Sequence, residues 1–342
     1  MPPKSTSSTA DEHYTVEKLE RNLENIGSVE EFEAKKPYDI KIVWKNVIIL
    51  SLLHVGAFYG LYLVCTSAKV FTFVFTCCYS HLGGMGITAG VHRLWAHRAY
   101  KAKWQLRLLL TFCNTIAFQD PVIHWARDHR LHHRHAETDA DPYNAKRGFF
   151  FAHVGWLLCR KHPEVKEKGK TIDVSDLFSD PILRFQYDHY FALTILCAAI
   201  IPTVVPVYGW NESWTSAFFV ATVMRYILSL HSTWLVNSAA HFYGNRPYDR
   251  NIYSAENGAV AFLTFGEGWH NYHHAFPWDY KTSELGSYSL NMTNAFIDFM
   301  AWIGWAYDRR TVSTDMVKRR VKRTGDGSHW QWGCDGKSVE YS

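Results

Sequence analysis

Residues 46 to 66 read NVIILSLLHVGAFYGLYLVCT, and residues 70 to 90 read VFTFVFTCCYSHLGGMGITAG. Each stretch holds about the twenty mainly apolar residues that an α-helix needs to cross the hydrocarbon core of a bilayer. Only the three residues SAK separate the two stretches. The sequence therefore predicts a transmembrane helical hairpin at this point of the chain.

A second hairpin of the same kind follows after a long polar segment. Residues 190 to 210 read YFALTILCAAIIPTVVPVYGW and residues 214 to 236 read WTSAFFVATVMRYILSLHSTWLV, joined by NES. Trp210 and Trp214 border the turn, as expected of an aromatic belt at a membrane surface. Arg225 lies in the middle of the last span, where a charged side chain is expected to face the helix bundle and not lipid. The alternative of four buried helices in a soluble protein fits the lengths less well. We predict an all-α, multi-pass membrane protein with four spans.

The distribution of basic residues predicts the orientation. Four spans with two short turns put both termini and the middle segment on one side of the membrane. Lysine and arginine gather on that side and are nearly absent from the turns: Lys35, Lys36, Lys41, Lys45, RKHPEVKEKGK at 160 to 170 and VKRRVKR at 317 to 323. The positive-inside rule makes this the cytosolic side. We expect a polar cytosolic N-terminal segment at 1–42, a membrane domain at 43–326 and a C-terminal tail at 327–342.

The charge and the cysteine content give no indication of a nucleic-acid-binding, disulfide-rich or zinc-ribbon protein. The formal net charge of +4 is small and gives no indication of a nucleic-acid partner. The run VKRRVKR could bind an acidic partner protein or anionic lipid, and a solvated surface explains it equally well. The seven cysteines are odd in number and lack CxxC spacing, so neither a disulfide framework nor a zinc ribbon is indicated.

Three histidine-rich boxes lie just beyond the ends of the predicted spans. They are HRLWAH with His92 and His97, HRLHH with His129, His132 and His133, and HNYHH with His270, His273 and His274. In a helix, positions i, i+3 and i+4 share a face, so each HxxHH box can aim its three imidazoles at one place. His92 and His97 are five positions apart, which suits two separate metal ions or a helix that ends between them.

His241 is a ninth candidate ligand, and Asn237 precedes it by one helical turn. Imidazole suits Zn, Cu, Fe and Ni, and so many ligands exceed what one tetrahedral site can use. The simplest interpretation is that two metal ions share these nine histidines. A carboxylate-bridged di-iron bundle needs two Glu-x-x-His motifs, whereas only Glu267 and His270 form one here. We therefore expect Glu267 either to lie behind the metal-binding histidines or to have a structural role. The other histidines, His135 included, are expected to pack or to lie at the surface.

The chain resembles the membrane fatty acyl-CoA desaturases, specifically the animal stearoyl-CoA (delta-9) type, with insect-like features. The likeness runs from about Val43 to Asp326. Four stretches carry it: GITAGVHRLWAHRAYKAKW, NTIAFQDPVIHWARDHRLHHRHAETDADPYNAKRGFFFAHVGWLLCRKHPEVKEKG, TWLVNSAAHFYGNRPYD and FGEGWHNYHHAFPWDYK. Histidine boxes also occur in membrane hydroxylases, but NSAAH together with EGWHNYHHAFPWDY points to the acyl-CoA desaturases.

The resemblance implies a stem of four spans, a cytosolic helical cap that carries a histidine-ligated di-iron site, and a narrow kinked tunnel between them. It implies an enzyme of the endoplasmic reticulum membrane that uses dioxygen to introduce a cis double bond, at delta-9, into saturated acyl-CoA of sixteen or eighteen carbons. Two iron ions would be the cofactor. Cytochrome b5, reduced by NADH-cytochrome b5 reductase, would supply electrons.

The resemblance also assigns roles to individual residues, with no catalytic group beyond the metal ligands. The implied ligands are His92, His97, His129, His132, His133, His241, His270, His273 and His274, with Asn237 reaching a metal through water. The implied tunnel bend is formed by Gln119, Trp125, Thr233 and Trp234. The implied coenzyme A site consists of Asn46, Arg127, Asp128, Arg160 and Lys161. Ser80 and Gly84 are implied at the tunnel end, where their small size would admit a longer or differently seated acyl tail.

Three alternatives stay open at this point. The first is a desaturase of other regiochemistry, such as delta-11. The second is a fatty acyl hydroxylase with the same ligands. The third is a histidine-rich membrane metal protein without redox chemistry. Transporters of that third kind place their ligands within the spans near the midplane, whereas these boxes lie beyond the span ends.

Overall fold

The structure is a computed structural model that describes residues 39–284 and 288–333. The described residues from Lys41 onward belong to one compact unit. Most of the predicted N-terminal segment and the end of the predicted C-terminal tail lie outside the described residues.

The four predicted spans are confirmed as helices that are long and apolar enough to cross a membrane. Three of them contain stretches of π-helix, so that several elements follow one another without a break. The first span is α2 (Trp44–Thr66), and the second is α3 (Val70–Met85) followed by η1 (Gly86–Ala96). The third is α10 (Tyr190–Thr194), η4 (Ile195–Ile200) and α11 (Ile201–Trp210). The fourth is α12 (Trp214–Ser216), η5 (Ala217–Met224), α13 (Arg225–Asn237) and α14 (Ala239–Phe242).

The second and fourth helices extend beyond the predicted boundaries, to Ala96 and Phe242. They contain 27 and 29 residues. At about 1.5 Å per residue such a helix is roughly 40 Å long, which exceeds the hydrocarbon core of about 30 Å. Their ends therefore project from the apolar region, and they carry His92 and His241 with them.

A buried carboxylate joins the turns of the two hairpins. Glu212 Oε2 accepts hydrogen bonds from the backbone N–H of Lys69 and from the Thr72 hydroxyl, and Trp210 Nε1 donates to the same hydroxyl. Both turns consequently lie at the same end of the bundle, as the short connections require.

Arg225 faces the bundle interior, as expected. Its side chain is buried and donates to the backbone carbonyls of Ala221, Ile116 and Ala198. Its guanidinium also lies 5.4 Å from the centre of the Tyr79 ring. The partners of this guanidinium are thus backbone carbonyls and an aromatic ring. They stabilise a cation in the membrane interior without a carboxylate.

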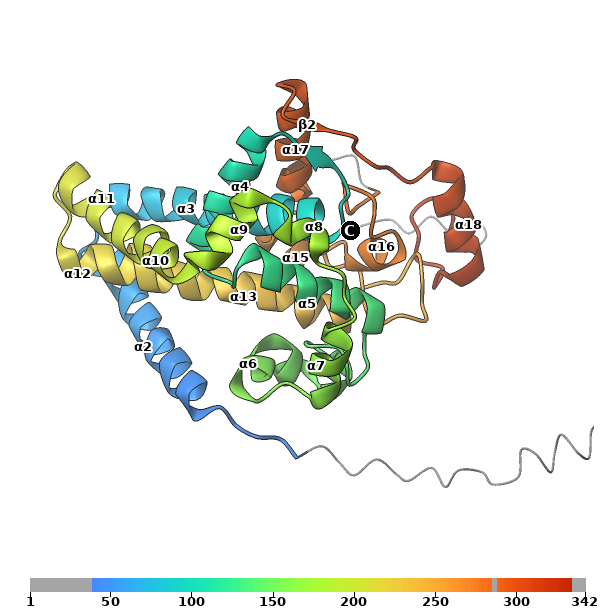
Figure 1. The fold of residues 1–342 in the computed structure, drawn as a ribbon, viewed down its shortest axis with the longest axis horizontal. Coiled ribbons are helices and arrows are strands. Elements are labelled where there is room, and N and C mark those ends of the chain that lie inside the picture. Colours follow the sequence, from blue (N-terminus) through green and yellow to red (C-terminus); the bar gives the residue numbers. More distant parts are fainter. Residues whose placement is uncertain (1–38, 285–287, 334–342) are drawn as a thin grey trace, which may run out of the picture. The chain divides into compact units, whose positions relative to one another are not determined.

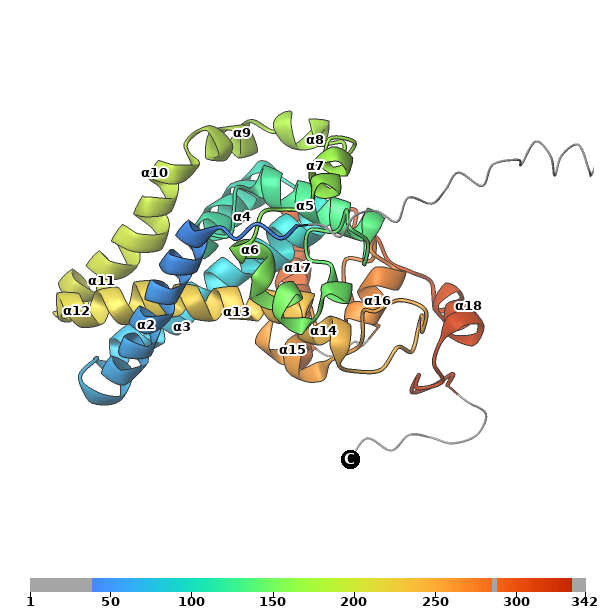
Figure 2. The same ribbon diagram turned by 90° about the horizontal axis from the view of Figure 1, so that it is seen from below.

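Shorter helices form a cap at the end of the bundle remote from the two turns (Figures 1 and 2). The cap elements are α4 (Trp104–Ala117), α5 (Val122–His135), η2 (Ala145–Arg147), η3 (Phe151–Gly155), α6 (Trp156–Leu158), α7 (Pro163–Gly169), α8 (Ser175–Phe178), α9 (Pro181–Asp188), α15 (Gly258–Leu263), α16 (His270–Ala275), η6 (Tyr288–Leu290), α17 (Met292–Trp302) and α18 (Thr314–Thr324), with strands β1 (Lys101–Ala102) and β2 (Ala306–Tyr307). The strands pair antiparallel, with Lys101 opposite Tyr307. The main core of the cap is built around Leu106, Leu110, Ile123 and Ile297, all buried.

The basic run of the C-terminal region lies on α18. Val317 and Val321 are buried against Tyr248, Tyr272 and Phe276, whereas the lysine and arginine side chains between them are mostly exposed. The six cysteines that the structure describes are free. Cys334 lies outside the described residues.

Candidate metal centre and acyl cavity

Nine histidine side chains converge at the end of the bundle where the cap begins. They form two groups, in each of which one ligand atom per residue lies within 4.8 Å of every other. The first group is His92, His97, His129, His133 and His273, and the second is His132, His241, His270 and His274. They come from η1, α5, α14 and α16, with His97 directly after η1. Facing Nε2 atoms are 2.8 Å apart between His97 and His129 and 3.0 Å apart between His241 and His270.

The structure corrects the expectation that each HxxHH box points its three rings at one place. In both boxes the first and last histidines belong to one group and the middle histidine belongs to the other. Helical geometry explains this division, because positions i and i+4 are about 40° apart around the axis whereas i+3 and i+4 are about 100° apart. Each of α5 and α16 therefore contributes ligands to both groups and fixes the two groups side by side.

His92 and His97 belong to the same group, so the interpretation that they serve separate metal ions is wrong, whereas the alternative of a helix that ends between them is confirmed. Their segment is a π-helix, in which hydrogen bonds connect residues i and i+5. The backbone N–H of His97 donates to the carbonyl of His92 at 3.1 Å, and the helix ends between the two residues, at Ala96. Five-residue spacing thus brings the two rings together, with centroids 4.8 Å apart.

Carboxylates lie behind three of the histidines. Asp141 Oδ1 is 2.9 Å from His132 Nδ1, and Glu137 Oε1 is 3.1 Å from His241 Nδ1. Glu267 Oε2 is 2.8 Å from His92 Nδ1. A proton on Nδ1 that points to a carboxylate leaves the Nε2 lone pair free for a metal, and this arrangement is common behind metal-binding histidines. Glu267 belongs to neither histidine group and lies behind His92, in agreement with the first of its two expected roles.

Burial keeps most of these imidazoles neutral. Burial, followed by the neighbouring histidines, holds six pKa values well below the usual range: those of His97, His129, His133, His270, His273 and His274. Burial also acts to lower the pKa of His132, but Asp141 raises it above the usual value. A neutral imidazole has one ring nitrogen with a free lone pair. Several such lone pairs that face one another are suited to a cation between them, so the donor set fits two divalent metal ions.

The pKa of Glu267 is low for a different reason. Burial alone would raise this pKa, but Arg93 and His92 lower it below the usual value. Arg93 Nε and Nη2 donate to Glu267 Oε1 at 3.0 and 2.9 Å. The carboxylate is therefore ionised and held by a two-pronged hydrogen bond, which fixes the orientation of His92.

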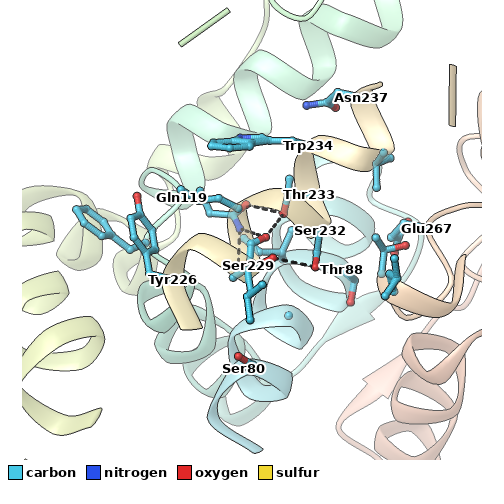
Figure 3. A pocket seen from close by; sticks show the side chains of 18 of the residues that line it. Ser80, Thr88, Gln119, Tyr226, Ser229, Ser232, Thr233, Trp234, Asn237 and Glu267 are labelled. Atoms are coloured by element: carbon cyan, nitrogen blue, oxygen red, sulfur yellow. Dashed lines mark hydrogen bonds between the residues drawn. The ribbon is translucent and has the colours of Figure 1, made fainter. Parts of the chain in front are cut away.

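A long cavity of about 880 Å³ runs past the histidines into the bundle. His92, His129, His132 and His270 form part of its wall. One face of α3 lines it with Phe73, Cys77, Ser80, His81 and Gly84. Figure 3 shows Asn237 and Trp234 on one side of this cavity and Ser80 on the opposite side. Its mainly apolar wall suits a hydrocarbon chain.

The residues assigned to the tunnel bend all line this cavity. The Thr233 hydroxyl donates to Gln119 Oε1 at 2.9 Å, and Gln119 Nε2 donates to Ser229 Oγ at 3.3 Å (Figure 3). The Trp125 ring stacks on the His129 ring with centroids 4.9 Å apart. Polar groups in the wall thus satisfy one another, and an indole packs beside one of the histidines that line the cavity.

The residues assigned to coenzyme A are only partly at the cavity. Asn46, Asp128 and Lys161 belong to its wall, whereas Arg127 and Arg160 do not. Arg127 and Lys161 both bind the Asp128 carboxylate. Burial acts to raise the pKa of Asp128, but these two cations lower it below the usual range. Asn46 Nδ2 donates to the carbonyl of Leu157 at 2.7 Å.

The sequence did not predict the two carboxylates that lie behind His132 and His241. Glu137 and Asp141 directly follow the second box, in AETDAD, and could have been found as partners for its histidines. His54, His231 and His153 form a string, with ring nitrogens 3.1 and 3.0 Å apart. His231 uses its two nitrogens for different neighbours, so these nitrogens do not converge and the string belongs to neither metal group.

Four membrane-crossing helices, two histidine groups and an apolar cavity beside them define a membrane protein with a candidate metal centre. Comparison with known proteins narrows this class. Residues 67–291 match the family model described as fatty acid desaturase. The chain belongs to the fatty acid desaturase family and is an oxidoreductase of its acyl-CoA desaturase branch.

Three relatives show how broad that branch is. An acyl-CoA Delta-9 desaturase of Acheta domesticus is 59% identical over 310 residues, which cover 90% of this chain and 86% of the relative. An acyl-CoA Delta12-desaturase of the same organism is 57% identical over 324 residues, covering 95% and 91%. An acyl-CoA Delta(11) desaturase of Spodoptera littoralis is 55% identical over 295 residues, covering 86% and 87%. The three names differ in the position of the double bond.

Proposed function

We propose that this protein is an oxygen-dependent acyl-CoA desaturase that introduces a cis double bond at delta-9 into saturated chains of sixteen or eighteen carbons. One observation carries the proposal: nine histidines converge in two groups at the wall of a long apolar cavity. A saturated chain offers no acidic proton and no electrophilic carbon at its middle. Side chains acting as acids, bases or nucleophiles therefore have nothing to act on, and a redox metal is required.

Two iron ions are the proposed cofactor. One would be held by His92, His97, His129, His133 and His273, and the other by His132, His241, His270 and His274. We assign Asn237, in the wall of the same cavity, as a ligand through water. Bound and reduced iron supplies, together with dioxygen, the oxidising power to remove two hydrogens from adjacent carbons.

The contribution of the chain itself is positioning. The cavity wall would hold one C–C bond of the substrate beside the histidine groups, and the bend at Gln119, Trp125, Thr233 and Trp234 would favour the cis geometry. The hydrogen bond between Thr233 and Gln119 keeps the polar atoms at the bend satisfied, so an apolar chain can lie against them. The enclosed apolar wall also keeps water away from the reacting carbons.

The head group of the substrate is proposed to bind at the cap end of the cavity. Lys161 belongs to the cavity wall there, and Arg127 adjoins it through Asp128. Together with Arg160 and Asn46, these side chains present cations and an amide at the opening. Cations and amide donors suit the phosphates of coenzyme A.

We further propose that the enzyme lies in the endoplasmic reticulum membrane with both termini in the cytosol. Electrons would come from cytochrome b5, itself reduced by NADH-cytochrome b5 reductase. The excess of lysine and arginine outside the two turns supports this orientation. The relative from Acheta domesticus named as a Delta-9 desaturase supports the proposed double-bond position.

Expression in a yeast that lacks its own delta-9 desaturase tests the proposal. We expect growth without added unsaturated fatty acid, and mass spectrometry of derivatised lipids should locate the new double bond at delta-9. A bond at delta-11 or delta-12 would overturn the regiochemistry but keep the reaction, and a hydroxylated product would indicate a hydroxylase. Purified protein that contains only zinc and gives no oxidised product would contradict the whole proposal.

Two histidine variants provide a matched control for that experiment. His132→Ala removes a member of the second group and should abolish the unsaturated product. His135→Ala changes a neighbouring histidine that belongs to neither group and should leave the product unchanged. Equal effects of the two variants would contradict the assignment of the ligands.

A further inference from the structure

Gly84 faces the cavity from α3, but the space above it is filled by a side chain from the turn that follows α15. A Cβ atom placed on Gly84 would lie 2.4 Å from Cε2 and 3.0 Å from Cδ2 of Phe265. The His81 ring, three positions earlier, packs on the same phenyl ring with centroids 4.6 Å apart. The ring of Phe265 therefore stands directly against this wall of the cavity.

The cavity wall continues on both sides of that ring. Along α3 and η1 it includes Cys77 and Phe73 in one direction and Thr88 and His92 in the other. These positions follow the helical repeat and so form one face. Phe265, itself part of the lining, thus lies between the part of the cavity next to the histidines and the part deeper in the bundle.

The backbone holds Phe265 in a conformation that a phenylalanine rarely adopts. Its φ is +61°, in the left-handed region, and its carbonyl accepts a hydrogen bond from the backbone N–H of Thr293. The following Gly266 has φ +116°, and a Cβ there would lie 2.5 Å from the Asn291 side chain. Backbone strain of this kind persists only where the surrounding structure imposes it. The ring is therefore placed by a tightly held turn.

We infer that Phe265 determines how long an acyl tail the enzyme accepts, by limiting how far the methyl end can extend past the histidine groups. This inference rests on the proposed function and names the residue that sets its substrate range. Ser80 and Gly84 are small, but the room above Gly84 is already taken by this ring. The ligand at this place is the terminal part of a saturated acyl chain. Because it has no polar group, the cavity can recognise it only by its length and shape.

The test compares acyl-CoA substrates of sixteen, eighteen, twenty and twenty-two carbons in competition, using the full-length enzyme with its iron and electron donors. Phe265→Val should raise the product ratio of twenty- to sixteen-carbon chains by at least about tenfold, because even one additional methylene accommodated in an apolar pocket changes specificity by roughly that factor. Phe265→Trp should shift the ratio towards shorter chains. The double-bond position, counted from the thioester, should stay unchanged. Phe299→Val, the same change at an exposed site on α17 outside the cavity lining, should leave the ratio unaltered.

A second measurement does not depend on turnover. Gly84→Ala should lower the melting temperature of the purified protein, and Phe265→Val should relieve this loss in the double variant, because the clashing atoms are gone. Phe265→Val should also extend the range of acyl-CoA lengths that protect the protein against thermal unfolding. An unchanged chain-length profile in active Phe265→Val, or a displaced double bond, would overturn the inference. Wild-type protein that binds acyl-CoA but forms no alkene would overturn the proposed function instead.

Discussion

Asp141 shows how a single carboxylate outside the two histidine groups can fix the orientation of one of their members. It accepts from His132 Nδ1 and also from the backbone N–H groups of Glu137 and Tyr143, so its position is fixed on three sides. Asp141→Asn removes the charge and one acceptor while keeping the shape. We expect the affinity for iron to fall between about 10- and 100-fold, the usual cost of losing such a partner. The measurement is the iron content of purified protein after dialysis against graded chelator.

Asp139 provides the control for this prediction. It lies two positions away in the same loop but its side chain is exposed. Asp139→Asn should therefore retain wild-type iron content at every chelator concentration. If both variants lose iron equally, the effect comes from the charge of the loop and not from orientation of His132.

The members of the two histidine groups were predictable, because histidine spacing is visible in a single sequence. The nine histidines of the two groups are the nine that the sequence indicated. Phe265 was not predictable, because nothing in its neighbourhood shows that its ring would reach Gly84 on a helix far away in the chain. Contacts of that kind depend on how elements pack, and local patterns do not record them.

The π-helix η1 explains why His92 and His97 lie in one group and not in two, although the alternative of a helix that ends between them was confirmed. In an α-helix, with 3.6 residues per turn, side chains five positions apart point in different directions. The i to i+5 hydrogen bond of a π-helix brings them together instead. The local sequence GITAGVHRLWA has no feature that distinguishes the two helix types. The four spans, in contrast, were predictable to within a few residues at most ends because their length and polarity are set by the bilayer.

Arg130 connects the end of η1 to α5 and supports both histidine-bearing helices. Its guanidinium donates to the carbonyls of Trp95 and Ala96, which the end of η1 leaves without partners, and forms a two-pronged pair with Asp176. Lysine cannot reproduce this fork. Arg130→Lys should therefore lower the free energy of unfolding by about 1.5 to 3 kcal/mol, the range for hydrogen bonds to charged groups. Thermal unfolding in detergent should show a lower melting temperature.

Arg184→Lys is the matched substitution on the surface. Arg184 pairs with Asp188 one helical turn away, and both side chains are about half exposed. Pairs of this kind contribute little, so this variant should melt with the wild type. A similar loss in both variants would mean that Arg130 acts as an ordinary surface charge.

The molecule as a whole separates its charges from its apolar surface. The four long helices expose large hydrophobic side chains such as Leu52, Phe58 and Phe71, as lipid contact requires. The cap presents a basic face on α18, where Val317 and Val321 anchor the helix and leave Lys318 and Lys322 exposed. An electron donor that carries acidic groups would be attracted to this face from a distance.

Reversal of these charges tests whether α18 receives the proposed cytochrome b5. Lys318→Glu combined with Lys322→Glu should slow reduction by cytochrome b5 about tenfold at low ionic strength, and the difference should shrink as salt screens the charges. Turnover with a small chemical reductant should stay at the wild-type level, because the variant leaves the histidine groups intact. Lys166→Glu combined with Lys168→Glu makes the same change on exposed residues of α7 and should have little effect. Equal slowing by the two double variants would show that the donor responds to net charge alone, and then α18 would not be its docking site.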